Sequence, residues 1–193
     1  MKIVAKIKIK SNPYLYPLPV VLIGANINNK PNFMALAWIT PVEHKPPLLA
    51  ISVHQSHKTY EGIEENKTFS VNIPSEGMIK PLDYCGIKSG KEIDKSEIFE
   101  IFYGNLKTAP MIKEAPLTME CRVVESFDTK AGHQLYIGEV ANAFCEENCL
   151  ENKIPSIEKI KPLIYAMGQR KYWSVGKFIG KAWKIGKNFK KSG

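Results

Sequence analysis

Apolar residues along the chain fall into short runs separated by turn residues, a pattern typical of antiparallel β proteins. Residues 3–9 alternate apolar and basic side chains, which predicts a half-buried edge strand. The other runs that we expect to form strands are 20–26, 33–40, 48–53, 68–73, 117–127 and 134–144. Their connections look too short for crossover helices, so neighbouring strands should pair antiparallel. The pattern therefore predicts a mainly β protein with a few short helices, and it favours a closed antiparallel barrel over a sandwich.

Polar and turn-forming residues mark where these runs end. Asn-Asn-Lys-Pro at 28–31 predicts a hairpin between the strands at 20–26 and 33–40. Residues 60–66 and 78–85 have the character of short helices. Residues 86–97 are polar and contain two glycines, which predicts a mobile loop.

Composition limits the class of protein. Hydrophobic residues make up 44% and charged residues 24% of the 193 residues, as expected for one globular domain with a substantial core. No apolar run approaches the roughly 20 residues that a membrane-spanning helix needs. The alternation at 3–9 does not resemble the apolar core of a signal peptide. We therefore expect a cytoplasmic protein without a membrane span.

The formal net charge of +8 is concentrated near the C-terminus. Residues 170–193 hold eight of the 27 basic residues and no acidic one, so the other 19 balance the 19 acidic residues. We expect residues 1–169 to form the barrel and residues 170–193 to form a basic helical extension, packed on the barrel or across a dimer. The alternatives for this tail are an anionic membrane, nucleic acid, an acidic redox protein or the phosphates of a pyridine nucleotide.

A polar cluster follows the apolar run at 48–53, where a strand gives way to a helix. Ser56, His57, Lys58 and Thr59 offer hydroxyls, an imidazole and an ammonium beside the free N–H groups of a helix N-terminus. These groups suit a phosphate, because a buried phosphate needs a cation and several donors. The alternative is that Ser56 or Thr59 only caps the helix.

Motifs for several other kinds of chemistry are absent from the sequence. It contains no G-x-G-x-x-G after a strand, no G-x-x-x-x-G-K-[ST], no G-x-S-x-G and no H-E-x-x-H. The four cysteines form no disulfide framework, and CEENC lacks the second pair that a zinc site needs. We expect no metal site, His133 at the surface, and Trp38, Trp173 and Trp183 in packing roles.

Five stretches of the sequence occur in the order and spacing of a known family. They are PLPVVLIGA, NFMALAWITPVEHKPPLLAISVHQSHKTYEGIEENKTFSVNIP, SGKEIDKSEIF, GHQLYIGEV and PLIYAMGQRKYWSVGKFIGKAW. Through them the chain resembles the flavin reductase-like family of FMN-binding split barrels, and more closely its flavoredoxin-type branch. The resemblance implies a six-stranded, Greek-key antiparallel barrel that binds FMN at the interface of a homodimer.

The resemblance also implies which residues bind the cofactor. In the family, the segment matching Met34, Ala35, Leu36 and Ala37 lies along the isoalloxazine ring, with main-chain N–H groups facing its polar edge. Thr40 corresponds to a further hydroxyl contact. The segment matching Ser56, His57, Lys58 and Thr59 holds the phosphate, and Lys91 and Lys95 match a loop that reaches the flavin.

The function implied by the resemblance is electron transfer through FMN. The electrons would come from NAD(P)H in a reductase, or from a redox protein in an electron carrier, and no side chain need act as acid or base. Relatives often carry small hydroxyl residues where this chain has Met34 and Leu36, so the use of NAD(P)H stays open. The alternative, suggested by the tail, is a non-enzymatic binding module that docks on nucleic acid or an anionic surface.

Overall fold

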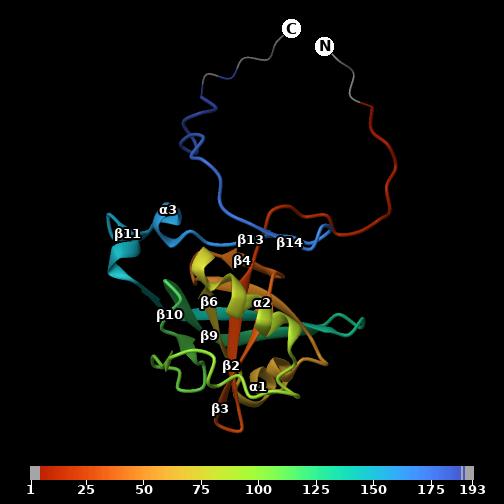
Figure 1. The fold of residues 1–193 in the computed structure, drawn as a ribbon, viewed down its shortest axis with the longest axis vertical. Coiled ribbons are helices and arrows are strands. Elements are labelled where there is room, and N and C mark those ends of the chain that lie inside the picture. Colours follow the sequence, from red (N-terminus) through yellow and green to blue (C-terminus); the bar gives the residue numbers. More distant parts are fainter. Residues whose placement is uncertain (1–4, 188, 190–193) are drawn as a thin grey trace.

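The computed structural model describes residues 5–187 and residue 189. Its main element is a seven-stranded antiparallel sheet in the order β3-β2-β6-β9-β10-β5-β4. These strands cross one another around a common interior (Figure 1). They are β2 (Val21–Ile27), β3 (Lys30–Leu36), β4 (Ile39–Glu43), β5 (Leu48–His54), β6 (Thr68–Ile73), β9 (Leu117–Asp128) and β10 (His133–Cys145).

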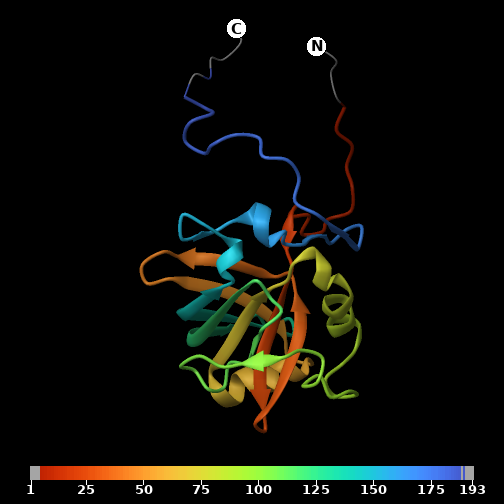
Figure 2. The same ribbon diagram turned by 60° about the vertical axis from the view of Figure 1, so that its left-hand side comes forward.

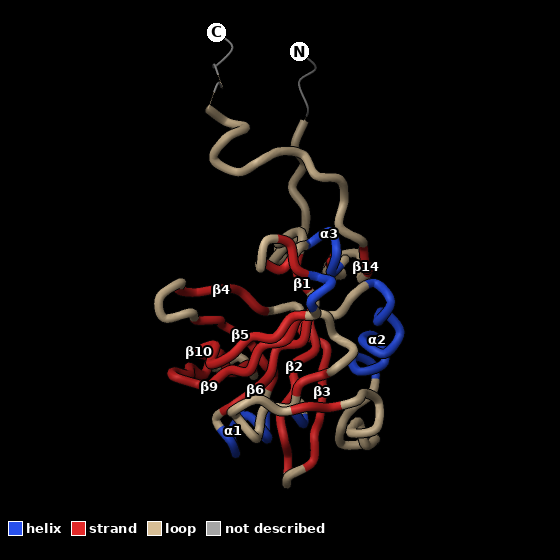
Figure 3. Tube along the Cα trace, turned by 90° about the vertical axis from the view of Figure 1, so that its left-hand side faces the viewer, coloured by secondary structure: helices blue, strands red, loops and turns tan. Residues whose placement is uncertain are grey.

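The two edges of this sheet, β3 and β4, are consecutive in the chain and are joined by Ala37 and Trp38 alone. They lie on opposite sides of the sheet (Figure 3). The strand predicted at 33–40 is therefore divided, so seven strands replace the six expected. At Trp38 the chain already bonds to β5, since its carbonyl oxygen accepts from Ser52 N–H at 3.0 Å. No β3–β4 ladder closes the barrel within residues 5–187, and the barrel is split between these edges.

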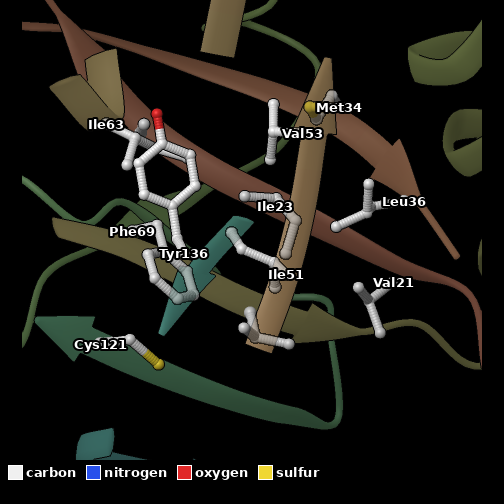
Figure 4. Packing of buried hydrophobic residues seen from close by; sticks show 12 residues of the cluster. Val21, Ile23, Met34, Leu36, Ile51, Val53, Ile63, Phe69, Cys121 and Tyr136 are labelled. Carbon is white, nitrogen blue, oxygen red and sulfur yellow. The ribbon is translucent and has the colours of Figure 1, made fainter. Parts of the chain in front are cut away.

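The interior is filled by apolar side chains from six strands and from α1 (Lys58–Asn66). Ile23, Ile51 and Phe69 are fully buried there, and Tyr136 directs its hydroxyl to Glu64 of α1 at 2.7 Å. Met34 and Leu36 point into this cluster from β3 (Figure 4). Because side chains alternate along a strand, Phe33 points the other way and packs in a second cluster under α2 (Ile79–Ile87).

Smaller elements surround the barrel, as Figure 2 shows from a second side. A three-stranded sheet joins β1 (Leu18–Pro19), β13 (Ile164–Ala166) and β14 (Lys171–Trp173). Two short pairs are β7 (Ile101–Phe102) with β8 (Met111–Ile112), and β11 (Leu150–Glu151) with β12 (Ile154–Pro155). Short helices are α3 (Ile157–Ile160) and the 3₁₀ turns η1 (Glu76–Met78) and η2 (Glu147–Cys149). No helix in the described part of the chain is long and apolar enough to cross a membrane.

Most of the predicted elements are confirmed. The strands expected at 20–26, 48–53, 68–73, 117–127 and 134–144 and the helices expected at 60–66 and 78–85 are all present within a few residues. The hairpin expected at 28–31 joins β2 to β3, where Asn28 and Asn29 have positive φ, which asparagine tolerates better than most residues.

Both terminal segments differ from the prediction. Residues 5–10 form no strand and pair with neither open edge of the main sheet, and Ile7 is 82% exposed. Residues 1–4 lie outside the described part. Residues 174–187 form no helix, and Trp183 is 93% exposed. Glycines at 176, 180 and 186 disfavour a helix there, each by about 1 kcal/mol. Both segments extend from the same end of the barrel (Figure 1).

The expected packing of the tail on a second copy stays a prediction. Trp173, on the edge strand β14, is exposed rather than packed within this chain. Trp38, in the segment between β3 and β4, is 43% exposed but packs against the ring of His133.

Glu120 of β9 is a fully buried carboxylate that fixes a loop to the barrel. Its two oxygens accept from the N–H groups of Asn105 at 2.9 Å and Leu106 at 2.8 Å, and Oε1 also accepts from the side-chain amide of Asn142. A buried carboxylate is stable only with such donors. Gly104 is required beside it, because a Cβ there would lie 2.6 Å from both oxygens.

We predict that Glu120→Gln lowers the free energy of unfolding by about 1–3 kcal/mol, because the new amide group would face a backbone N–H and leave a buried donor unpaired. Urea denaturation measures this effect. The control is Glu125→Gln on the exposed face of the same strand, which should change stability little. Equal effects of the two substitutions would contradict the role of Glu120.

Candidate functional site

A cavity of about 250 Å³ lies where β5 gives way to α1. Its walls come from β3, from the start of α1, from the end of α2 and the loop after it, and from Lys95. We call it the α1 cavity. Seven of the predicted site residues line it, although they come from three separate segments: Met34, Ala35, Ser56, His57, Lys58, Thr59 and Lys95.

The other four predicted residues lie outside the walls of the α1 cavity. Leu36 is buried in the barrel interior, Ala37 is in the segment between β3 and β4, and Thr40 is exposed on β4. Lys91 lines a neighbouring cavity instead. The roles expected for these residues stay predictions. The side chains of Met34 and Leu36 both point into the interior, so a contact from this segment would be made mainly by the backbone.

The N-terminus of α1 has no side-chain cap. His57 occupies the cap position, but its side chain makes no capping hydrogen bond. Ser56 Oγ lies 2.7 Å from His54 Nδ1, and Thr59 Oγ1 accepts from Asn32, so neither hydroxyl is used as the cap. The helix therefore offers unpaired backbone N–H groups and its positive dipole end beside the α1 cavity, an arrangement that favours an anion.

Asn32 of β3 is a site residue that the sequence did not single out. Its side-chain amide donates to Thr59 Oγ1 at 2.8 Å, and both residues are buried. Because the Thr59 oxygen already accepts this bond, the hydroxyl hydrogen is left to donate toward the α1 cavity. Asn32 thus orients the Thr59 hydroxyl as a donor. The local sequence did not indicate this role, because it depends on the register of β3, where Asn32 lies opposite Ala25 of β2.

Lys95 brings a cation into the wall of the α1 cavity. It is only 3% exposed, and its ammonium donates to the carbonyl oxygens of Phe33 at 3.0 Å and Cys85 at 2.9 Å. Burial lowers the pKa of Lys95 and raises that of the neighbouring Cys85 thiol to about 11, so Cys85 supplies no negative charge. Among the described residues no carboxylate pairs with Lys95.

The loop after α2 covers the site through a close backbone contact. A Cβ at Gly90 would lie 2.2 Å from Asn32 Oδ1, so only glycine allows the loop to approach β3 this closely. Glu61 of α1 pairs with Lys58 and, at 3.7 Å, with Lys91 of the loop. These ion pairs are partly exposed and weak, so they can rearrange around a ligand.

Three histidines and a tryptophan form an aromatic row beside the α1 cavity. Trp38 stacks on His133 with ring centroids 5.0 Å apart, His133 meets His54 edge-on at 4.9 Å, and His54 is 6.0 Å from His57. The row was missed because His133 and Trp38 come from distant segments. The local sequence signal was Gly132, the residue before His133. In the structure Gly132 has φ +91°, and a Cβ added there would lie 2.9 Å from His54 Nε2.

The electrostatics of the site favour a bound anion. The pKa of His57 is lowered, first by partial burial and then by the neighbouring His54, His133, Lys95 and Lys91. The same excess of positive groups attracts a negative ligand. Among the described residues, no three His, Cys, Asp or Glu side chains are placed to hold a metal ion.

We predict that the ring of His57 titrates below the usual histidine range in NMR spectra of the folded protein. Since its pKa is lower when folded than when unfolded, its contribution to stability is present above the unfolded pKa and is lost as the pH falls. His54→Gln should raise the pKa of His57, because it removes one repelling group. His44→Gln, in the exposed β4–β5 turn, is the control. An unchanged titration in the His54 variant would contradict this coupling.

Comparison with known proteins identifies the family. The family described as "Flavin reductase like domain" matches residues 14–174. The flavoredoxin of Methanosarcina acetivorans is 49% identical, with 95% of this chain and 98% of that one covered and a TM-score of 0.93. The flavoredoxin of Desulfovibrio vulgaris (Miyazaki F) is 32% identical, with coverage of 95% and 100% and a TM-score of 0.88.

A structure described as the FMN-binding protein of Thermus thermophilus shares the fold, at 22% identity, coverage of 94% and 99% and a TM-score of 0.78. The family match spans most of the chain and includes every segment that lines the α1 cavity. The flavoredoxin structures extend this likeness to the whole barrel. The chain therefore belongs to the flavin reductase-like domain family.

Proposed function

We propose that this protein binds FMN, with the phosphate in the α1 cavity, and that it transfers electrons between a reduced donor and an acceptor. The observation that carries the proposal is the buried Lys95 ammonium, which has no carboxylate partner among the described residues. A buried cation without a counterion is costly, so a bound anion would stabilise it. The phosphate of FMN supplies such an anion.

The residues of the α1 cavity fit this cofactor. Lys58 and Lys95 would compensate the phosphate charge, while Ser56, Thr59 and the uncapped N–H groups of α1 would donate hydrogen bonds. Asn32 would keep the Thr59 hydroxyl oriented as a donor. When bound, FMN would supply the group that accepts and releases electrons.

For electron transfer through FMN the protein needs only to bind the cofactor, orient it and exclude water. We therefore assign no catalytic acid or base. Two flavoredoxins at 49% and 32% identity support an electron-transfer role. The donor is NAD(P)H in a reductase, or an acidic redox protein in an electron carrier. The eight basic residues at 170–193 suit either partner, because both are negatively charged.

We also propose that the protein works as a homodimer. Large apolar side chains of both terminal segments are exposed, among them Leu15, Phe178, Ile179 and Trp183. Exposed apolar groups on this scale are typical of contact surfaces. A second copy that covers them would account for segments which this chain alone leaves unpacked.

We predict that the purified protein shows a flavin absorption spectrum, retained at about one FMN per chain after FMN is added and the excess removed, because the α1 cavity offers donors and cations for one phosphate. A colourless protein after reconstitution would contradict the proposal. A colourless protein that binds polyanions in a strongly salt-dependent way would instead favour the binding module. Steady-state oxidation of NADH or NADPH by the holoprotein then separates the reductase from the electron carrier.

We predict that Thr59→Val and Asn32→Ala weaken FMN binding about 10- to 100-fold, since a hydrogen bond to a charged group contributes about 1.5–3 kcal/mol. Binding of riboflavin, which lacks the phosphate, should change much less. Quenching of flavin fluorescence measures both affinities.

The control is Thr118→Val, which alters a buried threonine outside the α1 cavity whose hydroxyl has no partner in the described structure. It should leave both affinities unchanged. If Thr59→Val and Asn32→Ala weaken FMN and riboflavin equally, their effect is structural and the phosphate assignment fails.

A further inference from the structure

Two hydroxyl groups of the α1 cavity are held in different ways. Asn32 donates to Thr59 Oγ1 at 2.8 Å, which leaves the Thr59 hydrogen free to donate. Ser56 Oγ instead lies 2.7 Å from Nδ1 of His54, the last residue of β5. A histidine nitrogen accepts or donates according to its protonation, so the role of the Ser56 hydroxyl depends on the state of His54.

When Nδ1 of His54 carries no proton, both donors of Ser56 are used within the protein. The backbone N–H of Ser56 donates to Nδ1 at 3.2 Å, a bond that requires a lone pair on this nitrogen. The Ser56 hydroxyl is closer, at 2.7 Å, and donates to the same nitrogen. Ser56 then turns only oxygen lone pairs toward the α1 cavity that it lines, and these repel a phosphate.

A proton on Nδ1 reverses this arrangement. The nitrogen then donates to Ser56 Oγ, and the hydroxyl hydrogen is released to donate to a ligand. The backbone N–H of Ser56 loses its acceptor at the same time and needs a new one. A single proton on His54 therefore makes donors available at Ser56 and adds a positive charge beside the α1 cavity, and both favour an anion.

The surroundings of His54 oppose this proton in the absence of an anion. His133 of β10 meets the His54 ring edge-on at 4.9 Å, and the His57 ring lies 6.0 Å away at the N-cap of α1. Lys91 and Lys95 are close enough to these rings to lower the pKa of His57. The cluster is thus already rich in groups that are positive or can become so.

The carboxylates near this cluster are already paired. Glu61 of α1 pairs with Lys58 and, at 3.7 Å, with Lys91. Asp128 at the end of β9 pairs with a lysine of the turn that follows. A bound phosphate would therefore supply the negative charge that a protonated His54 needs. Phosphate binding and proton uptake favour each other, because coupling between two sites is reciprocal.

We propose that His54 is a proton-linked positioning residue, which turns the Ser56 hydroxyl into a donor for the FMN phosphate as FMN binds. His54 lies outside the walls of the α1 cavity and acts through Ser56. The proposal rests on the placement of FMN in the α1 cavity. FMN binding should take up a proton at His54, and this contribution to the affinity should grow as the pH falls through the histidine range, about pH 8 to 5.

The test is calorimetry of FMN binding to the full-length protein freed of flavin, in buffers of different protonation enthalpy. His54→Asn places an amide near the position of Nδ1, and this amide donates to Ser56 Oγ without taking up a proton. The FMN phosphate itself titrates near about pH 6, so wild type and variant are compared at the same pH. The wild type should take up more protons, and its affinity relative to His54→Asn should rise about tenfold from about pH 8 to 6.

Ser56→Ala separates the hydrogen bond from the charge alone. It keeps His54 but removes the hydroxyl, so it should lose most of the pH dependence, and adding His54→Asn should change little further. His44→Gln, in the exposed β4–β5 turn, is the control and should keep the wild-type profile. Riboflavin, which lacks the phosphate, should bind all these proteins equally well. A second readout needs no variant: in NMR spectra at about pH 7, His54 should be protonated with FMN and neutral without it.

Equal proton uptake and equal pH profiles in wild type and His54→Asn would overturn the proposal, as would a His54 ring whose protonation FMN does not change. A Ser56→Ala variant that keeps the wild-type profile would also overturn it, because His54 would then act by charge alone. These results leave the proposed function intact as long as FMN binds. A wild-type protein that binds no FMN at any pH would overturn both.

Discussion

Lys95 donates from a buried ammonium to the carbonyl oxygens of Phe33 and Cys85, and these two bonds hold its loop against β3 and α2. The cost of burying the charge is only partly offset by two neutral acceptors, since an ion normally requires a counterion as well. The contact that holds the loop in place therefore also leaves a buried positive charge, which a bound anion would stabilise. Lys95 lines the α1 cavity and the neighbouring cavity that Lys91 also lines.

β3 contributes both to the barrel interior and to the α1 cavity. Met34 and Leu36 point into the barrel and Phe33 packs under α2, while Met34 and Ala35 also line the α1 cavity. Because the strand is interrupted at Ala37 and Trp38, the chain reaches the opposite edge and brings Trp38 to His133 of β10. The interruption that leaves the barrel open thus also places the aromatic row.

Family membership and cofactor binding rest on different observations. Membership in the flavin reductase-like family follows from a match over residues 14–174. Binding of FMN is inferred from the donors and cations that the family fold gathers around one cavity.

Local sequence patterns determined most of the strands and helices and the part of the site that lies at residues 56–59. Short apolar runs specify strands, and Ser56 to Thr59 are contiguous, so their position at the start of a helix could be predicted. Tertiary structure alone decided the rest. Asn32, Gly90 and His133 meet the site through strand register and loop approach, which no local pattern encodes. The alternation at 3–9 was misleading for the same reason, because an amphipathic pattern forms a strand only where it pairs with a partner edge, and residues 5–9 pair with none here.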